Sequence, residues 1–319
     1  MRISGIDLFR GLSILLMVFF TMVQIFSGSL PDILVHNKPH SLHLGDFVLP
    51  MFLFASGMSL VFFQKKRSAK GKLGYSLDVF ERAGKLTLIW IFLSPISSGA
   101  FLGLDELMLS VILSVVCLAV VAMDWRLVAG LAFLPVIGYL GLYASGALPD
   151  FSGALSGGFG YWVLPFYLPV MLAGVLAGRS LHNGRWSVRT TMLFWACSIL
   201  TLALVFLVQP WKLDASPSFM GLSVMLSLVV FILVGERRNG LLEYLGRKPL
   251  RYWVLMFVLV LIPLSAYVLA SGEIVEMGPL EAIAASLACC VIVYLGSRLM
   301  DVALSLLPEA ELASQAKGR

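Results

Sequence analysis

The chain has 319 residues, of which 59% are hydrophobic and only 13% charged, and its formal net charge is +5. Soluble globular domains carry about 25% charged residues, so this composition excludes an ordinary soluble protein. The mean hydropathy is +0.94, and the basic residues stand in short runs between apolar segments. That distribution excludes a nucleic-acid surface and indicates a polytopic membrane protein.

Apolar segments long enough to cross a membrane recur along the chain. A membrane-spanning helix needs about 17–25 predominantly apolar residues. The sequence therefore predicts an all-α fold, a polytopic transmembrane helical bundle of about ten spans, at residues 8–27, 46–63, 86–102, 106–123, 127–145, 161–178, 190–208, 218–234, 251–271 and 280–303. We expect residues 1–304 to form a single transmembrane domain and residues 305–319 a short cytoplasmic tail.

Basic residues gather in three connecting segments, which follow the second, sixth and eighth predicted spans: 64–85, 179–189 and 235–251. Basic loops mark the cytoplasmic side of a membrane protein. Both termini are therefore expected to be cytoplasmic. The loop that carries His36 and Asp46 is expected to face the opposite side.

Two charged residues, Asp7 and Arg10, stand at the start of the first span. They are three residues apart, which is close enough to pair on a helix. One interpretation is a structural ion pair. The other is that Arg10, together with Arg82 or other cations of the same side, holds an anionic cofactor, because arginine suits phosphate.

The loop before the second span carries His36 and, ten residues later, Asp46. A neutral imidazole accepts a proton near pH 7, so His36 is a candidate general base. Asp46 is a candidate to hydrogen-bond the other ring nitrogen and stabilise the imidazolium. The alternatives are that His36 is only a solvated loop residue and that Asp46 only caps the second helix.

Two further histidines, His40 and His43, stand in the same loop. His36 and His40 have the i, i+4 spacing of two metal ligands on one helix face. Pro39 lies between them and fits only a first helical turn. We therefore expect no metal site.

The sixth predicted span contains Gly174 and Gly178, a pair of small residues four apart. Such pairs let two helix backbones approach closely in a membrane. We expect a close helix contact there.

Residues 2–60 resemble the heparan-alpha-glucosaminide N-acetyltransferase catalytic domain, one of the transmembrane acyltransferases. The resemblance is carried by the opening RISGIDLFRGLSILLMVF, by the His36 to Asp46 spacing, and by DFVLPMFLFASG at residues 46–57. Weaker similarities follow at Arg82, at residues 172–178, 215–219 and 245–250.

The resemblance implies transfer of an acetyl group from acetyl-CoA, as a co-substrate, to a sugar-type acceptor across the membrane. It implies that His36 is the catalytic residue and that Asp46 assists it. We expect the CoA phosphates to lie near Arg10, Asp7 and Arg82, and the protein to lie in a bacterial or archaeal inner (plasma) membrane. We also expect contact with membrane lipid and no binding of nucleic acid. A homodimer is possible.

Three alternatives remain at the level of sequence. Direct attack by the acceptor competes with an acetyl-His36 intermediate. The second alternative replaces the acyltransferase by a transporter or flippase for a sugar or lipid-linked substrate, with His36 and Asp46 as a proton-coupled site. A structural membrane subunit without activity is the third.

Overall fold

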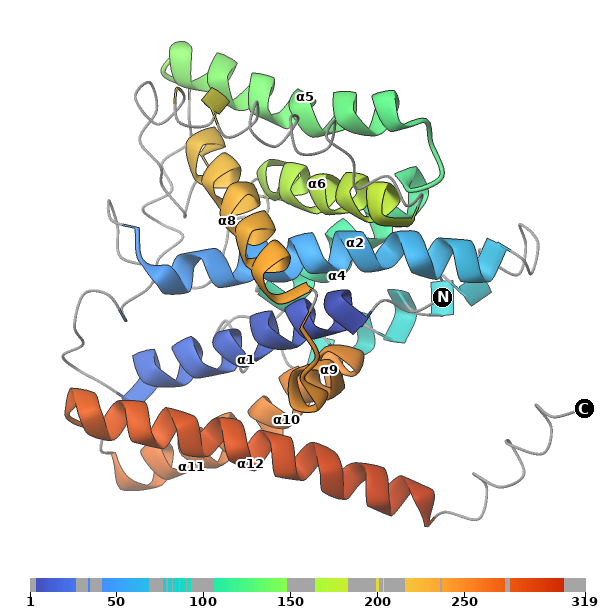
Figure 1. Cartoon of the computed structure of the whole chain (residues 1–319). Coiled ribbons are helices and arrows are strands. Elements are labelled where there is room, and N and C mark those ends of the chain that lie inside the picture. Colours follow the sequence, from blue (N-terminus) through green and yellow to red (C-terminus); the bar gives the residue numbers. More distant parts are fainter. Residues whose placement is uncertain are drawn as a thin grey trace, which may run out of the picture.

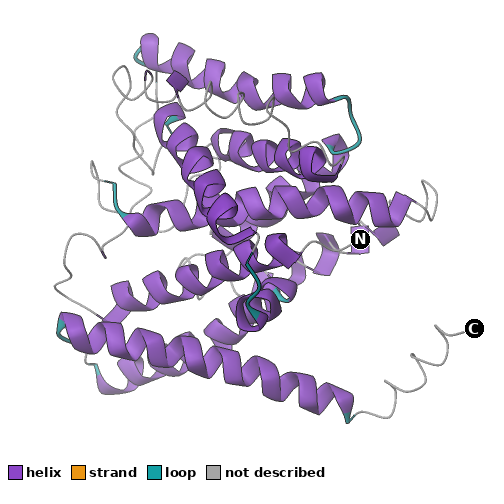
Figure 2. Ribbon diagram, in the orientation of Figure 1, coloured by secondary structure: helices purple, strands orange, loops and turns teal. Residues whose placement is uncertain are grey.

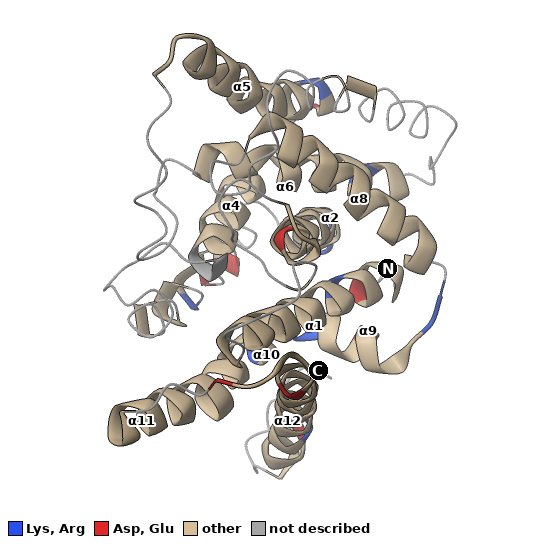
Figure 3. Ribbon diagram, turned by 90° about the vertical axis from the view of Figure 1, so that its left-hand side faces the viewer, with Lys and Arg blue, Asp and Glu red and all other residues tan. Residues whose placement is uncertain are grey.

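The computed structural model describes residues 4–26, 34, 42–68, 106–147, 164–182, 216–235, 237–272 and 276–306, with short pieces between 77 and 92 and at 199–203. These residues form helices and the turns between them, and none of them forms a strand (Figure 2). The predicted all-α class is therefore confirmed. Few of the described helical residues are charged, so most of the ribbon is tan in a view onto the end where α2 begins (Figure 3).

Two helices lie in the middle of the bundle, α1 (Ser4–Phe26) and α2 (Val48–Ser68), the latter preceded by a 3₁₀ turn, η2 (Leu44–Phe47) (Figure 1). Both contribute to two hydrophobic clusters. The first cluster joins them to α4 (Glu106–Val120), α5 (Trp125–Ala144), α6 (Leu164–His182) and α8 (Pro217–Gly235). The second joins them to α9 (Gly240–Arg247), α10 (Pro249–Met256), the π-helical η5 (Phe257–Leu261), α11 (Ile262–Ser271) and α12 (Pro279–Ser305).

Within the described residues, seven helices are long and apolar enough to cross a membrane: Ser4–Phe26, Leu44–Lys66, Trp125–Ala144, Leu164–His182, Pro217–Gly235, Pro249–Ser271 and Pro279–Ser305. They correspond to seven of the predicted spans, so the protein is an integral membrane protein. The spans predicted at 86–102 and 190–208 lie largely outside the described residues.

The span predicted at 106–123 is shorter in the structure. Its described helix, α4, has 15 residues and ends at Val120, before the predicted end at residue 123. The chain turns after Val120 because Asp124 caps the next helix, accepting the Arg126 backbone N–H at 2.8 Å. The total of about ten spans remains a prediction.

Contacts between helices fix their directions. α1 and α2 run in opposite directions (Figure 1), and Arg10, near the start of α1, bonds Ser59 in the second half of α2. The rings of Phe62 and His182, near the ends of α2 and α6, lie 5.6 Å apart, so these two are parallel. α1 begins at the end of the bundle where α2, α6, α8 and α12 finish. We name this the Arg10 end, and the opposite end the Asp46 end.

Two connections start and finish at opposite ends of the bundle. Arg179, near the end of α6, donates to the carbonyls of Val121 and Met123, just after α4. Like α2 and α6, α4 therefore finishes at the Arg10 end. α2 finishes at the Arg10 end and α4 begins at the Asp46 end, and the same holds for α6 and α8. The spans predicted at 86–102 and 190–208 stand between these helices in the sequence.

Glycines bring α2 and α6 into close contact. A Cβ atom added to Gly174 would lie 2.2 Å from the Phe54 carbonyl oxygen, and one added to Gly178 would lie 2.8 Å from that of Met58. On the other helix, a Cβ at Gly57 would lie 2.1 Å from the Met171 oxygen. The close helix contact predicted for the Gly174 and Gly178 pair is confirmed.

A second pair of glycines joins α1 to α9. A Cβ at Gly11 would lie 1.8 Å from the Leu242 carbonyl oxygen, and one at Gly246 would lie 1.7 Å from the Asp7 carbonyl oxygen. Both distances are far below van der Waals contact, so only glycine permits this approach. It sets the short helix α9 directly against the start of α1.

Candidate active site

Asp46 is completely buried in the 3₁₀ turn η2, immediately before α2. Its Oδ2 accepts the backbone N–H of His43 at 2.8 Å, and its own N–H donates to the His43 carbonyl at 3.0 Å. The capping role predicted as an alternative is therefore present, with one difference. Asp46 lies at the third position of the short turn that leads into α2, and it satisfies the N–H of the residue before that turn.

The start of α8 lies beside this turn. The rings of Phe47 and Phe219 are 5.5 Å apart. Two buried hydroxyls stand 3.2 Å from each other there, that of Ser216, just before α8, and that of Ser218, in its first turn. A buried carboxylate is costly unless hydrogen bonds or charges compensate it, so Asp46 and its neighbours form the first candidate site.

His36 and His40 lie outside the described residues. The structure does describe Leu34 and Leu42 on either side, and both pack against the hydrophobic clusters. His43 contributes its backbone to Asp46. The catalytic role of His36 thus stays a prediction, as does its pairing with Asp46.

Arg10 is the centre of a second polar set at the opposite end. Its side chain is 12% exposed. Nη2 donates to Asp7 Oδ1 at 2.8 Å, Nη1 to Ser59 Oγ at 3.0 Å, and Nε to the Gly246 carbonyl at 2.5 Å. The predicted Asp7–Arg10 ion pair is confirmed, and the guanidinium also joins α1 to α2 and α9.

Arg247 is a neighbour of this set that sequence reasoning did not single out. Its Nε lies 3.9 Å from Asp7 Oδ2, and its side chain is 48% exposed. It also pairs with Glu243 at 3.2 Å. The only signal in the sequence was its place in the basic segment 235–251, and nothing there indicated which cation would reach Asp7. Arg82 lies outside the described residues.

Replacing Arg10 with glutamine is expected to destabilise the protein by about 3 kcal/mol, because it leaves the nearly buried Asp7 carboxylate and the Gly246 carbonyl without their main partner. Thermal unfolding of the purified protein in detergent measures this. Arg247→Gln is the matched control: its side chain is half exposed, so a loss of less than about 1 kcal/mol is expected. Equal losses in the two variants would contradict the assignment of Arg10 as the structural centre.

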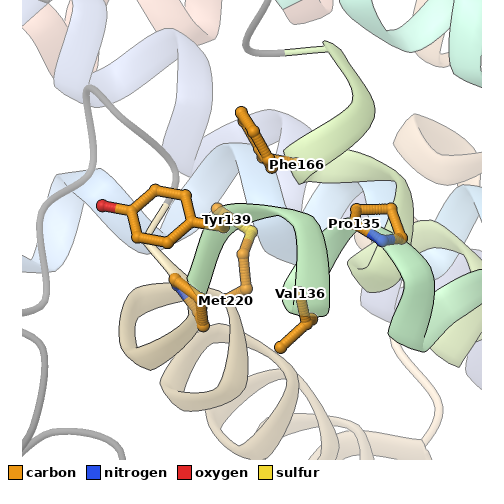
Figure 4. Close-up of a pocket in the computed structure, with 6 residues that line it drawn as sticks. Pro135, Val136, Tyr139, Phe166 and Met220 are labelled. Carbon is orange, nitrogen blue, oxygen red and sulfur yellow. The ribbon is translucent and has the colours of Figure 1, made fainter. Parts of the chain in front are cut away.

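A small hollow lies elsewhere, between α5, α6 and α8 (Figure 4). It is a shallow, open hollow that encloses almost no volume, and it is lined by Pro135, Val136, Tyr139, Phe166, Pro217 and Met220. Ligand sites usually measure about 300–1,000 Å³ and carry several convergent polar groups. This hollow is too small and too apolar to be the candidate site.

The two polar sets are separated along α2. Asp46 precedes the helix and Ser59 lies 13 residues further on, which corresponds to roughly 20 Å of helix. The bundle thus carries a buried carboxylate at one end and a buried arginine–carboxylate pair at the other. These features define a polytopic membrane protein with a polar site toward each end of its helical bundle.

The chain belongs to the heparan-alpha-glucosaminide N-acetyltransferase catalytic family, whose sequence profile matches residues 2–210. A comparison with curated proteins gave no match. The resemblance predicted from residues 2–60 is therefore confirmed, and the family makes the chain a transmembrane acyltransferase. The matched region includes Asp7, Arg10, His36, Asp46 and Arg82; helices α8 to α12 lie beyond it.

Proposed function

We propose that the protein transfers an acetyl group from acetyl-CoA, bound at the Arg10 end, to an amine or hydroxyl of a sugar-type acceptor at the Asp46 end. One observation carries this proposal. Asp46 is a fully buried carboxylate, fixed by the His43 N–H, ten residues after His36 in a chain of this family.

In the proposed step His36 acts as the general base. Its imidazole takes the proton of the acceptor N–H or O–H while the acceptor atom attacks the thioester carbonyl. The new bond to the acetyl carbon forms, the carbon–sulfur bond breaks, and the CoA thiolate recovers a proton. Asp46 holds the imidazole in one tautomer and stabilises its positive charge. The competing route passes the acetyl group first to His36.

The burial of Asp46 supports this role. A carboxylate in an apolar environment stabilises a neighbouring cation more strongly than one in water, because the local dielectric is low. Since the turn holds Asp46 through the His43 backbone, its position does not depend on the His36 side chain. An imidazolium that forms transiently at His36 would therefore meet a preorganised partner.

The CoA phosphates are proposed to lie near Arg10, Asp7 and Arg82. Arg10 already donates to three protein groups, so its part is to supply charge and to hold α9 in place. Arg247 is better suited to a direct contact, because it is half exposed and adjoins the same Asp7 carboxylate. Since acetyl-CoA is made in the cytoplasm, the Arg10 end is proposed to be cytoplasmic, in a bacterial or archaeal plasma membrane.

The test is acetyl transfer by the full chain in proteoliposomes, with labelled acetyl-CoA and an amino sugar on opposite sides. The wild type is expected to produce labelled acetyl sugar. His36→Ala should lower the rate by about 100- to 10,000-fold, the contribution of a general base. His43→Ala is the matched control, because it removes a neighbouring imidazole but keeps the backbone N–H that Asp46 accepts.

Two outcomes decide between the alternatives. Passage of the sugar across the bilayer without CoA would overturn the acyltransferase proposal in favour of transport. Label retained on the wild-type protein in the absence of acceptor, and absent in His36→Ala, would select the acetyl-His36 route over direct attack.

A further inference from the structure

A third polar cluster lies at the Arg10 end, outside the region that the family profile matches. It is formed by α9, the start of α10 and the last turns of α12. Its centre is Asp301, which forms ion pairs with Lys248 and Arg251 and accepts the hydroxyl of Tyr244 at 2.6 Å. Tyr244 also bonds Ser297 at 3.1 Å. The cluster therefore fixes the Tyr244 ring against α12.

Arg298 lies on this fixed ring. Its guanidinium carbon stands 4.3 Å from the centre of the Tyr244 ring, and its Nε donates to the Tyr294 hydroxyl at 3.0 Å. The side chain is exposed, and within the described part of the chain its two Nη nitrogens make no hydrogen bond. A planar cation that is held in place, with two donors left over, is suited to bind an oxyanion bidentately.

The cluster around Arg298 carries an excess of positive charge. Lys248 and Arg251 share the one carboxylate of Asp301, and Lys248 and Arg298 both lie over the Tyr244 ring, 5.1 and 4.3 Å from its centre. Anionic groups are therefore attracted to this surface.

The position of Arg298 along α12 decides what kind of anion it meets. Glu281 and Arg298 are consecutive charged residues of α12, and the helix rises about 26 Å between them. This is close to the roughly 30 Å of a hydrocarbon core. Glu281 lies at the Asp46 end, so Arg298 lies at the level of the lipid headgroups at the Arg10 end.

The same face of α12 is apolar. Leu295 and Val302, three residues before and four residues after Arg298, are exposed side chains of the same helical face. Leu287 and Val291 extend this exposed row toward the middle of the membrane. α12 lies at the edge of the bundle, where lipid would contact it (Figure 1). A cation at headgroup level and an apolar row beneath it match the two parts of a phospholipid.

We propose that this surface is a binding site for an anionic phospholipid. Its phosphate is held by the Nη nitrogens of Arg298 with the surrounding positive charge, its headgroup lies beside Tyr244 and Tyr294, and an acyl chain lies along Leu295 and Val291. Tyrosines are enriched at this level of membrane proteins. The site is independent of the acetyl transfer proposed above.

The experiment measures lipid binding to the delipidated full-length protein by native mass spectrometry. Phosphatidylglycerol and phosphatidylcholine, with identical acyl chains, are added separately. The wild type is expected to bind phosphatidylglycerol about tenfold more tightly than phosphatidylcholine. In Arg298→Gln this preference should fall about fivefold, the contribution of one cation near the surface.

Arg126→Gln is the matched control. Arg126 is an exposed arginine 5.6 Å from the ring of Trp125, so the control removes a similar stacked cation from α5. An equal loss of preference in both variants, or equal binding of the two lipids by the wild type, would overturn the proposal. So would glycerol phosphate, which has no acyl chain, if it displaced the lipid at equal concentration. Unchanged thermal unfolding of Arg298→Gln without lipid shows that the variant is folded.

Discussion

Replacing Gly246 with alanine is expected to prevent the protein from reaching its native packing. The added methyl carbon would lie 1.7 Å from the Asp7 carbonyl oxygen, and both atoms belong to helix backbones that cannot rotate away. The helices α1 and α9 would have to separate, which also weakens the hydrogen bond from Arg10 to the Gly246 carbonyl. We expect a loss of more than about 3 kcal/mol, at the upper limit of overpacking.

The measurement is thermal unfolding in detergent, together with the fraction of protein that elutes as a single species in gel filtration. Gly11→Ala should behave in the same way, since its added carbon would lie 1.8 Å from the Leu242 oxygen. The matched control is Gly141→Ala on α5, where no atom lies within 4 Å. There, alanine should be neutral or stabilise by up to about 1 kcal/mol. Similar results at Gly246 and Gly141 would contradict the close approach of α1 and α9.

Replacing Asp46 with asparagine is expected to separate the two roles of this residue. The amide oxygen of asparagine accepts the His43 N–H as the carboxylate does, so stability should change by less than about 1 kcal/mol. The negative charge that would stabilise the His36 imidazolium is lost, so acetyl transfer should fall by about 100-fold or more. Asp46→Ala should lose activity and, in addition, the cap.

Asp124→Asn provides the comparison for this experiment. Asp124 also accepts a backbone N–H, that of Arg126, but it lies at the Arg10 end and is exposed. Its replacement should leave transfer unchanged. If Asp46→Asn kept full activity while Asp46→Ala unfolded, Asp46 would be a cap alone, and the catalytic proposal would lose its second residue.

Local patterns in the sequence predicted much of this protein. Apolar length alone identified seven helices, because a membrane span leaves a signal within one segment. The spacing of Asp7 and Arg10 indicated their ion pair, and that of Gly174 and Gly178 indicated a close contact. Each of these features depends on residues only a few positions apart.

Contacts between distant segments could not be predicted in this way. Arg10 meets Ser59, 49 residues away, and Gly246, 236 residues away. No periodicity relates these positions, and the pairing of α1 with α9 follows from the packing of the whole bundle. The end of α4 was missed for a local reason: the apolar pattern continues to residue 123, but α4 ends at Val120 and Asp124 already caps α5. Arg247 is one of several cations in the segment 235–251, and the sequence did not indicate which of them would reach Asp7.

The meeting of α1 with α9 also bears on the order in which the protein is assembled. Domains generally begin to fold from the N-terminus during synthesis. α1 enters the membrane first, yet the carbonyl that Arg10 binds belongs to Gly246, far along the chain. Until α9 emerges from the ribosome, the side of α1 that packs against α9 is uncovered, and Arg10 has its Ser59 acceptor on α2 but not its Gly246 acceptor. The packing around the first helix is thus completed late in synthesis. A chain released before residue 246 lacks the segment that packs against the start of α1.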